Sequence, residues 1–210
     1  MFGQPNRPEK AAAVVLAAGR STRMGADNKL LLEVEPGVPV VRRAVESGLA
    51  AGLAPVHVVT GHQADEVRAA LDGLDCRFVH NPDYAGGLSG SIRAGFREAV
   101  GKGADGVLVL LGDMPFLPDS AIAAVLSRAA DAPDRIVQGV HDGKPAHPVW
   151  LPARVAGLVE RLDGDRGVRS LVSETGQDMV SVEVGTDAAF DLDTPADFAS
   201  ARARAIKSGN

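Results

Sequence analysis

The 210-residue sequence predicts an α/β protein built around a doubly wound, mostly parallel sheet. Continuous apolar runs, which are typical of strands buried on both faces, alternate along the chain with segments whose apolar residues lie three and four positions apart, as in helices. Repeated strand-then-helix order produces parallel strands joined by right-handed crossovers. The sequence shows no internal repeat, low-complexity tract or linker, so we expect a single domain.

The alternation is clearest before residue 134. The run GVLVLLGD is the most apolar, so we place its strand at the centre of the sheet. The segment VPVVRRAVESGLAAG ends in glycine, as helices commonly do. Strands are expected over 10–19, 55–61, 76–80 and 106–113, and helices over 38–52, 63–73, 89–101 and 118–131.

The pattern is looser in the last third of the chain. Two strands are expected within 134–151, on either side of a turn at Asp142 and Gly143. The closing helix has a clear start, because Thr194 fits the N-cap, Pro195 the first helical position and Asp197 the capping-box partner. Further elements are helices over 152–162, 166–176 and 194–207 and a strand over 177–184.

Composition and charge narrow the possible functions. The 22 Lys and Arg residues against 27 Asp and Glu give a formal net charge of −5, which does not favour nucleic acid as a partner. The polar start and the lack of a bilayer-length apolar run predict neither a signal peptide nor a membrane span. One cysteine, Cys76, allows no intrachain disulfide. We expect a cytoplasmic protein in which Cys76 is a small core or edge residue.

The loop between the first strand and Lys29 is unusually long and basic. Strand-to-helix connections commonly have about two to six residues, but this one runs from Gly19 to about Asn28, at the edge where open α/β sheets bind ligands. It combines flexible backbone, hydroxyl donors and cations: Gly19, Ser21, Thr22, Arg23, Gly25 and Lys29. Such donors favour a phosphate chain, although the spacing matches neither a Walker loop nor the dinucleotide fingerprint. The alternative is a solvated surface loop with scattered basic residues.

Three aspartates are candidate metal ligands. Asp113 follows the central strand, so its carboxylate is expected at the same edge as the glycine-rich loop. Asp191 and Asp193 lie two apart on an expected strand and would point the same way, which favours a nearby cation. Carboxylates beside a triphosphate are typical of Mg²⁺ sites, so we expect Asp113 and one of the other two to bind Mg²⁺. The alternative is that these acids cap the helices that follow them.

A second glycine-rich segment, HNPDYAGGLSGSIRAG, joins the third strand to its helix. Its glycines free the backbone, its serines donate, and a helix start presents unpaired amides, so the segment can read a nucleobase largely through main chain. The residues concerned are Gly86, Gly87, Ser89, Gly90 and Ser91. A generic glycine-rich loop is the alternative.

Three basic residues in the last third of the chain are candidates for a functional role: His147, and the pair Arg166 and Arg169. His147 stands beside a proline in GKPAHPVWLP, where a structural hydrogen-bonding histidine is the alternative. Arg166 and Arg169 lie three apart at an expected helix start, where the helix dipole disfavours cations unless they meet an anion. Solvated surface charge is the alternative for this pair.

The run LAAGRSTRMGADNK resembles the signature of the MobA-like nucleotidyltransferase superfamily, whose members activate sugars, isoprenoid precursors and molybdopterin. The run GDMP resembles the metal-binding motif of the same superfamily. The resemblance implies a Rossmann-like fold in which the first loop wraps a triphosphate, Arg23 and Lys29 act on the phosphates, and Asp113 binds the metal. It implies nucleotide contacts from Leu16, Ala17, Ala18, Gly19, Ser21, Thr22, Met24, Gly25, Thr60, Gly61, Asn81, Gly86, Gly87, Ser89 and Ser91.

This interpretation gives a domain organisation. A flexible N-terminal extension over 1–10 precedes one nucleotidyltransferase domain over 11–207. Within that domain we expect a nucleotide-binding half over 11–133 and a smaller acceptor-side cover over 134–207.

Several runs are similar to one branch of this superfamily, the molybdenum cofactor cytidylyltransferases: HNPDYAGGLSGS, VTGH, GKPAHPVWLP and GDRGVRSL. The branch implies Mg²⁺-dependent transfer of CMP from CTP to the terminal phosphate of molybdopterin, with a molybdenum hydroxylase as the client. It implies acceptor contacts from Pro145, His147, Arg166 and Arg169. Ala18 stands where related guanylyltransferases carry glycine, which favours cytosine.

Two alternatives remain from the sequence. One is a guanylyl- or uridylyltransferase that acts on another phosphorylated acceptor. The other is a non-catalytic chaperone that binds nucleotide or cofactor for a molybdenum enzyme.

Overall fold

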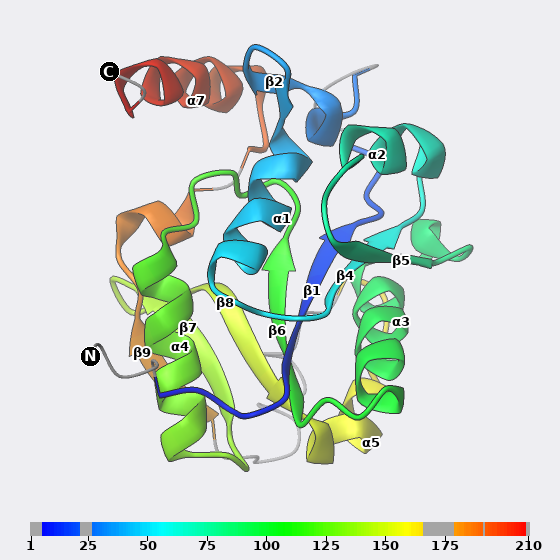
Figure 1. Cartoon of the computed structure of the whole chain (residues 1–210), viewed down its shortest axis with the longest axis vertical. Helices are drawn as coiled ribbons and strands as arrows, with labels where there is room; N and C mark the ends of the chain where they lie inside the picture. The colour runs from blue at the N-terminus through cyan, green and yellow to red at the C-terminus, as the bar shows by residue number, and fades with distance from the viewer. Residues whose placement is uncertain (1–5, 22–26, 166–178, 191, 209–210) are drawn as a thin grey trace.

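The computed structural model describes residues 6–21, 27–165, 179–190 and 192–208 of the chain. Its centre is a seven-stranded sheet in the order β5-β4-β1-β6-β8-β7-β9 (Figure 1). Neighbouring strands are parallel, except that β8 runs against both β6 and β7. The strands are β1 (Ala11–Ala17), β4 (Val56–Thr60), β5 (Cys76–His80), β6 (Gly106–Leu111), β7 (Ile136–His141), β8 (Lys144–Pro152) and β9 (Met179–Glu183). The predicted mostly parallel sheet is confirmed, with β6 at its centre.

Helices cover both faces of the sheet. On one face lie α1 (Val40–Ala50), α2 (Ala64–Ala70) and α4 (Asp119–Asp131). On the other face lie α3 (Leu88–Gly101) and the short α5 (Ala156–Val159). Every residue of β1 is buried between these layers, as a continuous apolar run predicts. The doubly wound arrangement is therefore confirmed.

The strand register brings three loops to one edge of the sheet. Leu16 of β1 pairs with Leu111 of β6, and Ala17 pairs with Thr60 of β4, so the three strands end level. The amide of Gly112 then donates to the Leu16 carbonyl at 2.9 Å, and an added Cβ at Gly112 would lie 2.9 Å from the same oxygen. Because β8 is antiparallel, it begins at this edge. The loops after β1, β4 and β6 therefore lie at the same edge of the sheet as the start of β8.

A small hairpin before α1 was not predicted. The strands β2 (Glu33–Glu35) and β3 (Val38–Pro39) pair in antiparallel fashion and form a separate two-stranded sheet. The helix expected from residue 38 consequently begins at Val40. Pro39 has φ −63° and ψ 150°, an extended conformation, which keeps it out of the helix.

The region after β8 also differs from expectation. The helix expected over 152–162 consists of the 3₁₀ turn η4 (Ala153–Val155) followed by α5. The helix expected over 166–176 lies outside the described residues. After β9 come the 3₁₀ turn η5 (Thr186–Ala189) and the closing helix α7 (Pro195–Ser208).

The closing helix begins with the predicted capping box. The Thr194 amide donates to Oδ2 of Asp197 at 2.8 Å, and the Asp197 amide donates to Oγ1 of Thr194 at 3.2 Å. The hydrogen bond from the Thr194 side chain is the main cause that lowers the pKa of the Asp197 carboxyl. Ala201 and Phe198 of α7 belong to an apolar cluster with Val34 of β2. The last helix thus packs beside the first hairpin, at one end of the molecule (Figure 1).

The structure places two features noted in the sequence, Cys76 and part of the N-terminal extension. Cys76 is partly buried at the start of the edge strand β5, and burial is the main cause that raises the pKa of its thiol. This agrees with a small edge residue. In the N-terminal extension, the Arg7 guanidinium donates to the carbonyls of Ala51 (3.0 Å) and Gly52 (2.8 Å) at the end of α1.

One histidine of the core has no hydrogen-bond partner among the described residues. His57 of β4 is 0% exposed, and neither ring nitrogen is bonded. Burial is the main cause that lowers the pKa of His57; Arg77 and Lys102 lower it further, against an opposing effect of Glu98. Burial likewise lowers the pKa of His147. Both rings are therefore neutral in the folded protein at neutral pH.

We expect the free energy of unfolding to fall as the pH drops below about 6.5, the ordinary value for histidine. Below this pH the histidines of the unfolded chain bind protons that the buried rings of the folded chain do not bind. The stability that comes from the neutral rings is therefore fully present above this pH and is lost as the pH falls below it. The substitution His57→Leu should reduce the slope between pH 6.5 and 5 by up to about 1.4 kcal/mol per pH unit. Urea denaturation at several pH values measures the slope, and an unchanged slope would contradict the assignment.

Candidate functional site

A cleft of about 530 Å³ opens at the sheet edge where β1 and β6 end. Its lining combines charged and small residues from widely separated segments. The polar lining residues are Arg20, Ser21, Lys29, Tyr84, Ser91, Asp113, Asp165 and Asp193, and the others are Leu16, Ala18, Gly19, Leu30, Ala85, Gly87, Leu88 and Leu111. Both predicted glycine-rich segments and two of the three predicted acids therefore meet in one space.

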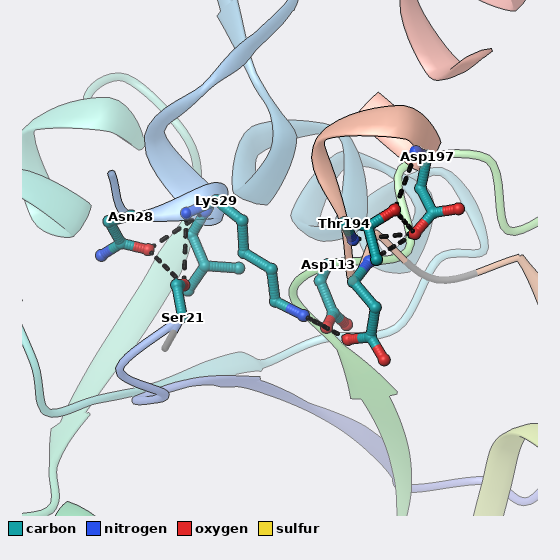
Figure 2. Close-up of polar contacts among 8 residues, drawn as sticks. Ser21, Asn28, Lys29, Asp113, Thr194 and Asp197 are labelled. Carbon is teal, nitrogen blue, oxygen red and sulfur yellow. Dashed lines mark hydrogen bonds and ion pairs between the residues drawn. The ribbon is translucent and has the colours of Figure 1, made fainter. Parts of the chain in front are cut away.

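The charged centre of the cleft is Lys29. Its Nζ lies 2.5 Å from Oδ2 of Asp113 and 3.1 Å from Oδ1 of Asp193 (Figure 2). The Lys29 and Asp113 side chains are only 16% and 17% exposed, whereas that of Asp193 is 37% exposed. Burial by itself lowers the pKa of Lys29, but the two carboxylates, Asp113 foremost, outweigh it and hold the pKa above the ordinary value. Lys29 therefore keeps its charge at neutral pH.

The same carboxylates fit a divalent cation. Asp113 and Asp193 approach one point from different segments, since both contact the same ammonium nitrogen. Hard carboxylate oxygens from one or two residues, completed by substrate phosphates, are the donors that Mg²⁺ takes in nucleotide sites. Among the described residues there is no group of three or more His, Cys, Asp or Glu side chains that could hold a metal. A cation held by these two carboxylates would take further ligands from a phosphate chain or water.

Asp193 is not on a strand, which corrects the sequence analysis. The strand β9 ends at Glu183, and the described residues between η5 and α7 lie outside regular structure. Alternation along a strand therefore cannot explain how Asp193 is aimed, and Asp191 lies outside the described residues. Instead, the Leu192 amide donates to the Asp113 carbonyl at 3.2 Å, which joins this loop to the end of β6.

Lys29 is positioned by a clasp across the base of the first loop. Ser21 Oγ donates to Oδ1 of Asn28 at 3.2 Å and accepts from the Lys29 amide at 3.2 Å (Figure 2). The same Asn28 oxygen accepts from the Leu30 amide at 3.1 Å and so caps the 3₁₀ turn η2 (Lys29–Leu31). Ser21 was expected to donate to nucleotide, but its hydroxyl hydrogen is directed to Asn28. Ser21 also lines the cleft, so its contact with a nucleotide stays a prediction.

The second glycine-rich segment forms the opposite wall. Asn81 is buried, donates to Ser91 Oγ at 3.1 Å and accepts from the Asp83 amide at 3.1 Å, so it folds the segment rather than lining the cleft. Gly87 has φ +103°, which favours glycine, and the next turn docks through the Ser89 amide on the Gly164 carbonyl at 3.1 Å. Of the residues predicted here, Gly87 and Ser91 line the cleft; Gly86 and Ser89 do not.

Three other predicted nucleotide contacts lie behind the lining. Ala17 and Thr60 are completely buried at the ends of β1 and β4. An added Cβ at Gly61 would lie 2.5 Å from the Tyr84 side chain, so Gly61 makes room for that ring. Leu16, Ala18 and Gly19 do line the cleft.

Of the predicted acceptor residues, only Pro145 and His147 belong to the described part of the chain, and neither lines the cleft. His147 is partly buried on β8, and its Nδ1 lies 3.5 Å from the Val109 carbonyl of β6. Burial is the main cause that lowers its pKa, and the nearby Asp113 carboxylate opposes this effect. Pro145 is exposed.

Three polar residues of the lining were not predicted. Arg20 follows Gly19 directly and could have been inferred from the basic loop. Tyr84 and Asp165 gave no such signal, because they reach the cleft only through the docking of the segments around Gly87 and Gly164. Seven predicted site residues lie outside the described residues: Thr22, Arg23, Met24, Gly25, Arg166, Arg169 and Asp191.

Comparisons with known proteins agree with this architecture. The family model for the MobA-like NTP transferase domain matches residues 13–180. The chain is 36% identical over 135 residues to the "Bifunctional protein GlmU" of Rhizobium etli (strain CIAT 652), with 63% of this chain and 29% of that protein covered. It thus spans less than a third of that relative's length. Within the described part of the chain, no helix has the length and apolar character needed to cross a membrane.

Two solved structures are similar over nearly the whole chain. A nucleotidyl transferase from Methanothermobacter thermautotroptrophicus has a TM-score of 0.81 and 28% identity, with 95% of this chain and 99% of that chain covered. The Rv0371c protein of Mycobacterium tuberculosis H37Rv has a TM-score of 0.71 and 30% identity, with 90% and 96% covered. That protein has also been solved in a complex with manganese.

If Ser21 acts through Asn28, the substitutions Ser21→Ala and Asn28→Ala should not be additive. Each removes the clasp, so the double variant should be more stable than the sum of the single losses predicts, with a coupling of about 1 kcal/mol. Urea denaturation of the four proteins measures it. Ser21→Ala combined with Ser47→Ala, whose hydroxyl donates to the Arg43 carbonyl within α1, is the additive control. Full additivity of the Ser21 and Asn28 losses would contradict the clasp.

Proposed function

We propose, from the premise that this chain belongs to the family of MobA-like NTP transferase domains, that it transfers CMP from CTP to a molybdopterin-type acceptor. The chain is a nucleotidyltransferase; the choice of CTP and of the acceptor is the proposal. The observation that carries it is the cleft in which Lys29, Asp113 and Asp193 meet between two glycine-rich walls.

The reaction requires little acid–base chemistry. The acceptor's terminal phosphate attacks the α-phosphorus of CTP, a new P–O bond forms, and the bond to pyrophosphate breaks. The attacking phosphate is already ionised at neutral pH, so no strong base is needed, and catalysis consists of alignment and stabilisation of charge. Lys29 suits the second task, because its ammonium is fixed in position and stays protonated.

Asp113 and Asp193 would hold the divalent cation, with Asp191 as the alternative to Asp193. When bound, the cation supplies charge neutralisation to the phosphates. Three carboxylates and two cations line the described cleft, so an anionic triphosphate needs further positive charge to enter it. The manganese complex of the Mycobacterium tuberculosis relative supports a divalent cation here, and Mg²⁺ is our proposal for this chain. Arg23 would add a phosphate contact, as its place in the signature implies.

The nucleoside would lie between the first loop and the second glycine-rich segment. Ala18, Gly19 and Gly87 offer backbone there, and Ser91 offers a hydroxyl. Ala18 in place of glycine is the feature that favours cytosine. For the acceptor we propose the side of the cleft toward β8, with His147 and Pro145 nearby and Arg166 and Arg169 as phosphate ligands. A molybdenum hydroxylase would then receive the product.

Calorimetric titration with CTP, GTP, UTP and ATP, each with and without Mg²⁺, tests the proposal. We expect CTP to bind at least about tenfold more tightly than the others, a difference of about 1.4 kcal/mol, and only with Mg²⁺. A preference for GTP or UTP would replace the cytidylyl assignment with the first alternative. Tight CTP and molybdopterin binding without pyrophosphate release would support the chaperone instead.

The substitution Lys29→Ala should lower kcat by at least about a hundredfold, the loss typical of one charge-stabilising donor. The protein should remain folded, as circular dichroism can verify. Lys102→Ala, at the C-terminal end of α3, is the matched control and should leave kcat unchanged. A loss of tenfold or less would assign Lys29 to binding alone.

A further inference from the structure

One carboxylate fastens the loop of Asp193 to the first turn of α7. Oδ2 of Asp197 accepts hydrogen bonds from the backbone amides of Asp193 (3.2 Å) and Thr194 (2.8 Å) and from the Thr194 hydroxyl (2.7 Å) (Figure 2). An ordinary capping box ends at the amide of the N-cap residue, here Thr194. The additional bond to Asp193 extends the fastening to the residue whose side chain contacts Lys29.

No strand holds the backbone of Asp193, which lies between two hydrogen bonds: that of the Leu192 amide to the Asp113 carbonyl (3.2 Å) and that of its own amide to Asp197 (3.2 Å). Its side chain reaches Lys29 at 3.1 Å and is 37% exposed, more than twice as exposed as that of Asp113. Asp113, by contrast, follows the central strand β6 directly. The direction of the Asp193 carboxylate therefore rests on local hydrogen bonds.

The helix that carries Asp197 is itself fixed to the site. Its residue Arg204 pairs with Asp187 at 2.6 Å and lies 4.9 Å from the ring centre of Phe116. Phe116 belongs to the turn that follows Asp113, and it packs in the same apolar cluster as Ala201. The first turn of α7 thus has a defined position relative to both Asp113 and the hairpin after Lys29.

We propose that Asp197 is a positioning residue that holds the Asp193 carboxylate toward Asp113, so that both can bind one divalent cation. This inference rests on the proposed function. Groups that orient a metal ligand without touching the metal commonly contribute about 10–100-fold to metal affinity. Asp197 acts here through backbone amides, which keeps its own carboxylate engaged within the turn.

Binding of Mn²⁺, followed by electron paramagnetic resonance with and without a non-hydrolysable CTP analogue, tests the proposal independently of turnover. We expect Asp197→Ala to weaken Mn²⁺ binding at least about tenfold, as loss of such a group does. Thr194→Ser keeps both the hydroxyl and the amide and should bind Mn²⁺ as the unaltered protein does.

Two controls separate positioning from general effects. Ala199→Gly destabilises α7 at an exposed position and leaves the contacts of Asp197 in place. Even with a fall in Tm comparable to that of Asp197→Ala, this variant should keep its Mn²⁺ affinity unchanged. Removing the Asp197 charge also weakens cation binding at a distance, but salt screens that contribution. The loss caused by a displaced Asp193 should persist at about 0.5 M salt, where the screening length is only a few ångströms.

The outcomes distinguish the two proposals. If the unaltered protein binds no Mn²⁺ even with the analogue, the metal assignment fails and the positioning role fails with it. If the unaltered protein binds Mn²⁺ and Asp197→Ala binds it equally well, the positioning role alone is overturned. The positioning role is likewise overturned if Ala199→Gly weakens Mn²⁺ binding as much as Asp197→Ala does, or if high salt abolishes the loss caused by Asp197→Ala.

Discussion

The described site depends on one electrostatic requirement: the carboxylates of Asp113 and Asp193 need a cation between them. Two like charges that share a partly buried point repel strongly. Lys29 meets this need from a distant part of the sequence, 164 positions before Asp193. On the proposed function, the requirement also explains why acids line a cleft for an anionic substrate, because acids that need a cation would bring positive charge to the place where phosphates bind.

Each of the three charged groups is placed by a different kind of interaction. The parallel register of β1 and β6 places Asp113, the clasp of Ser21 and Asn28 places Lys29, and the capping box of α7 places the backbone of Asp193. The apolar cluster of Val34, Leu192 and Ala201 then joins the hairpin after Lys29 to the loop that contains Asp193 and to the helix α7 that follows it. Weak local contacts are enough to align the three charged groups, because the central sheet and this apolar cluster fix the segments that carry those groups.

Whether a feature could be predicted from the sequence depends on how far apart along the chain its interacting residues lie. The strand β1, the central place of β6 and the pair of Thr194 and Asp197 were predictable, because apolar runs and capping boxes are local patterns. The hairpin β2–β3 has too few residues to show alternation, and its strands are recognisable only by pairing. Asp193 was wrongly assigned to a strand, because a spacing of two also occurs in a loop. Tyr84 and Asp165 were missed because only tertiary docking brings them to the cleft.

In the proposed site, the groups assigned to the reaction differ physically from those assigned to the nucleoside. Charges such as Lys29 and Asp113 act through side chains, so a sequence signature reveals them directly. The walls around Ala18, Gly19 and Gly87 offer backbone amides and carbonyls, which every sequence possesses. On the proposed function, selectivity there would depend on how closely a base can approach, and one methyl group at Ala18 would change that approach. A sequence signature therefore predicts nucleotidyl transfer more securely than the choice of nucleotide, and the two properties can vary independently on one fold.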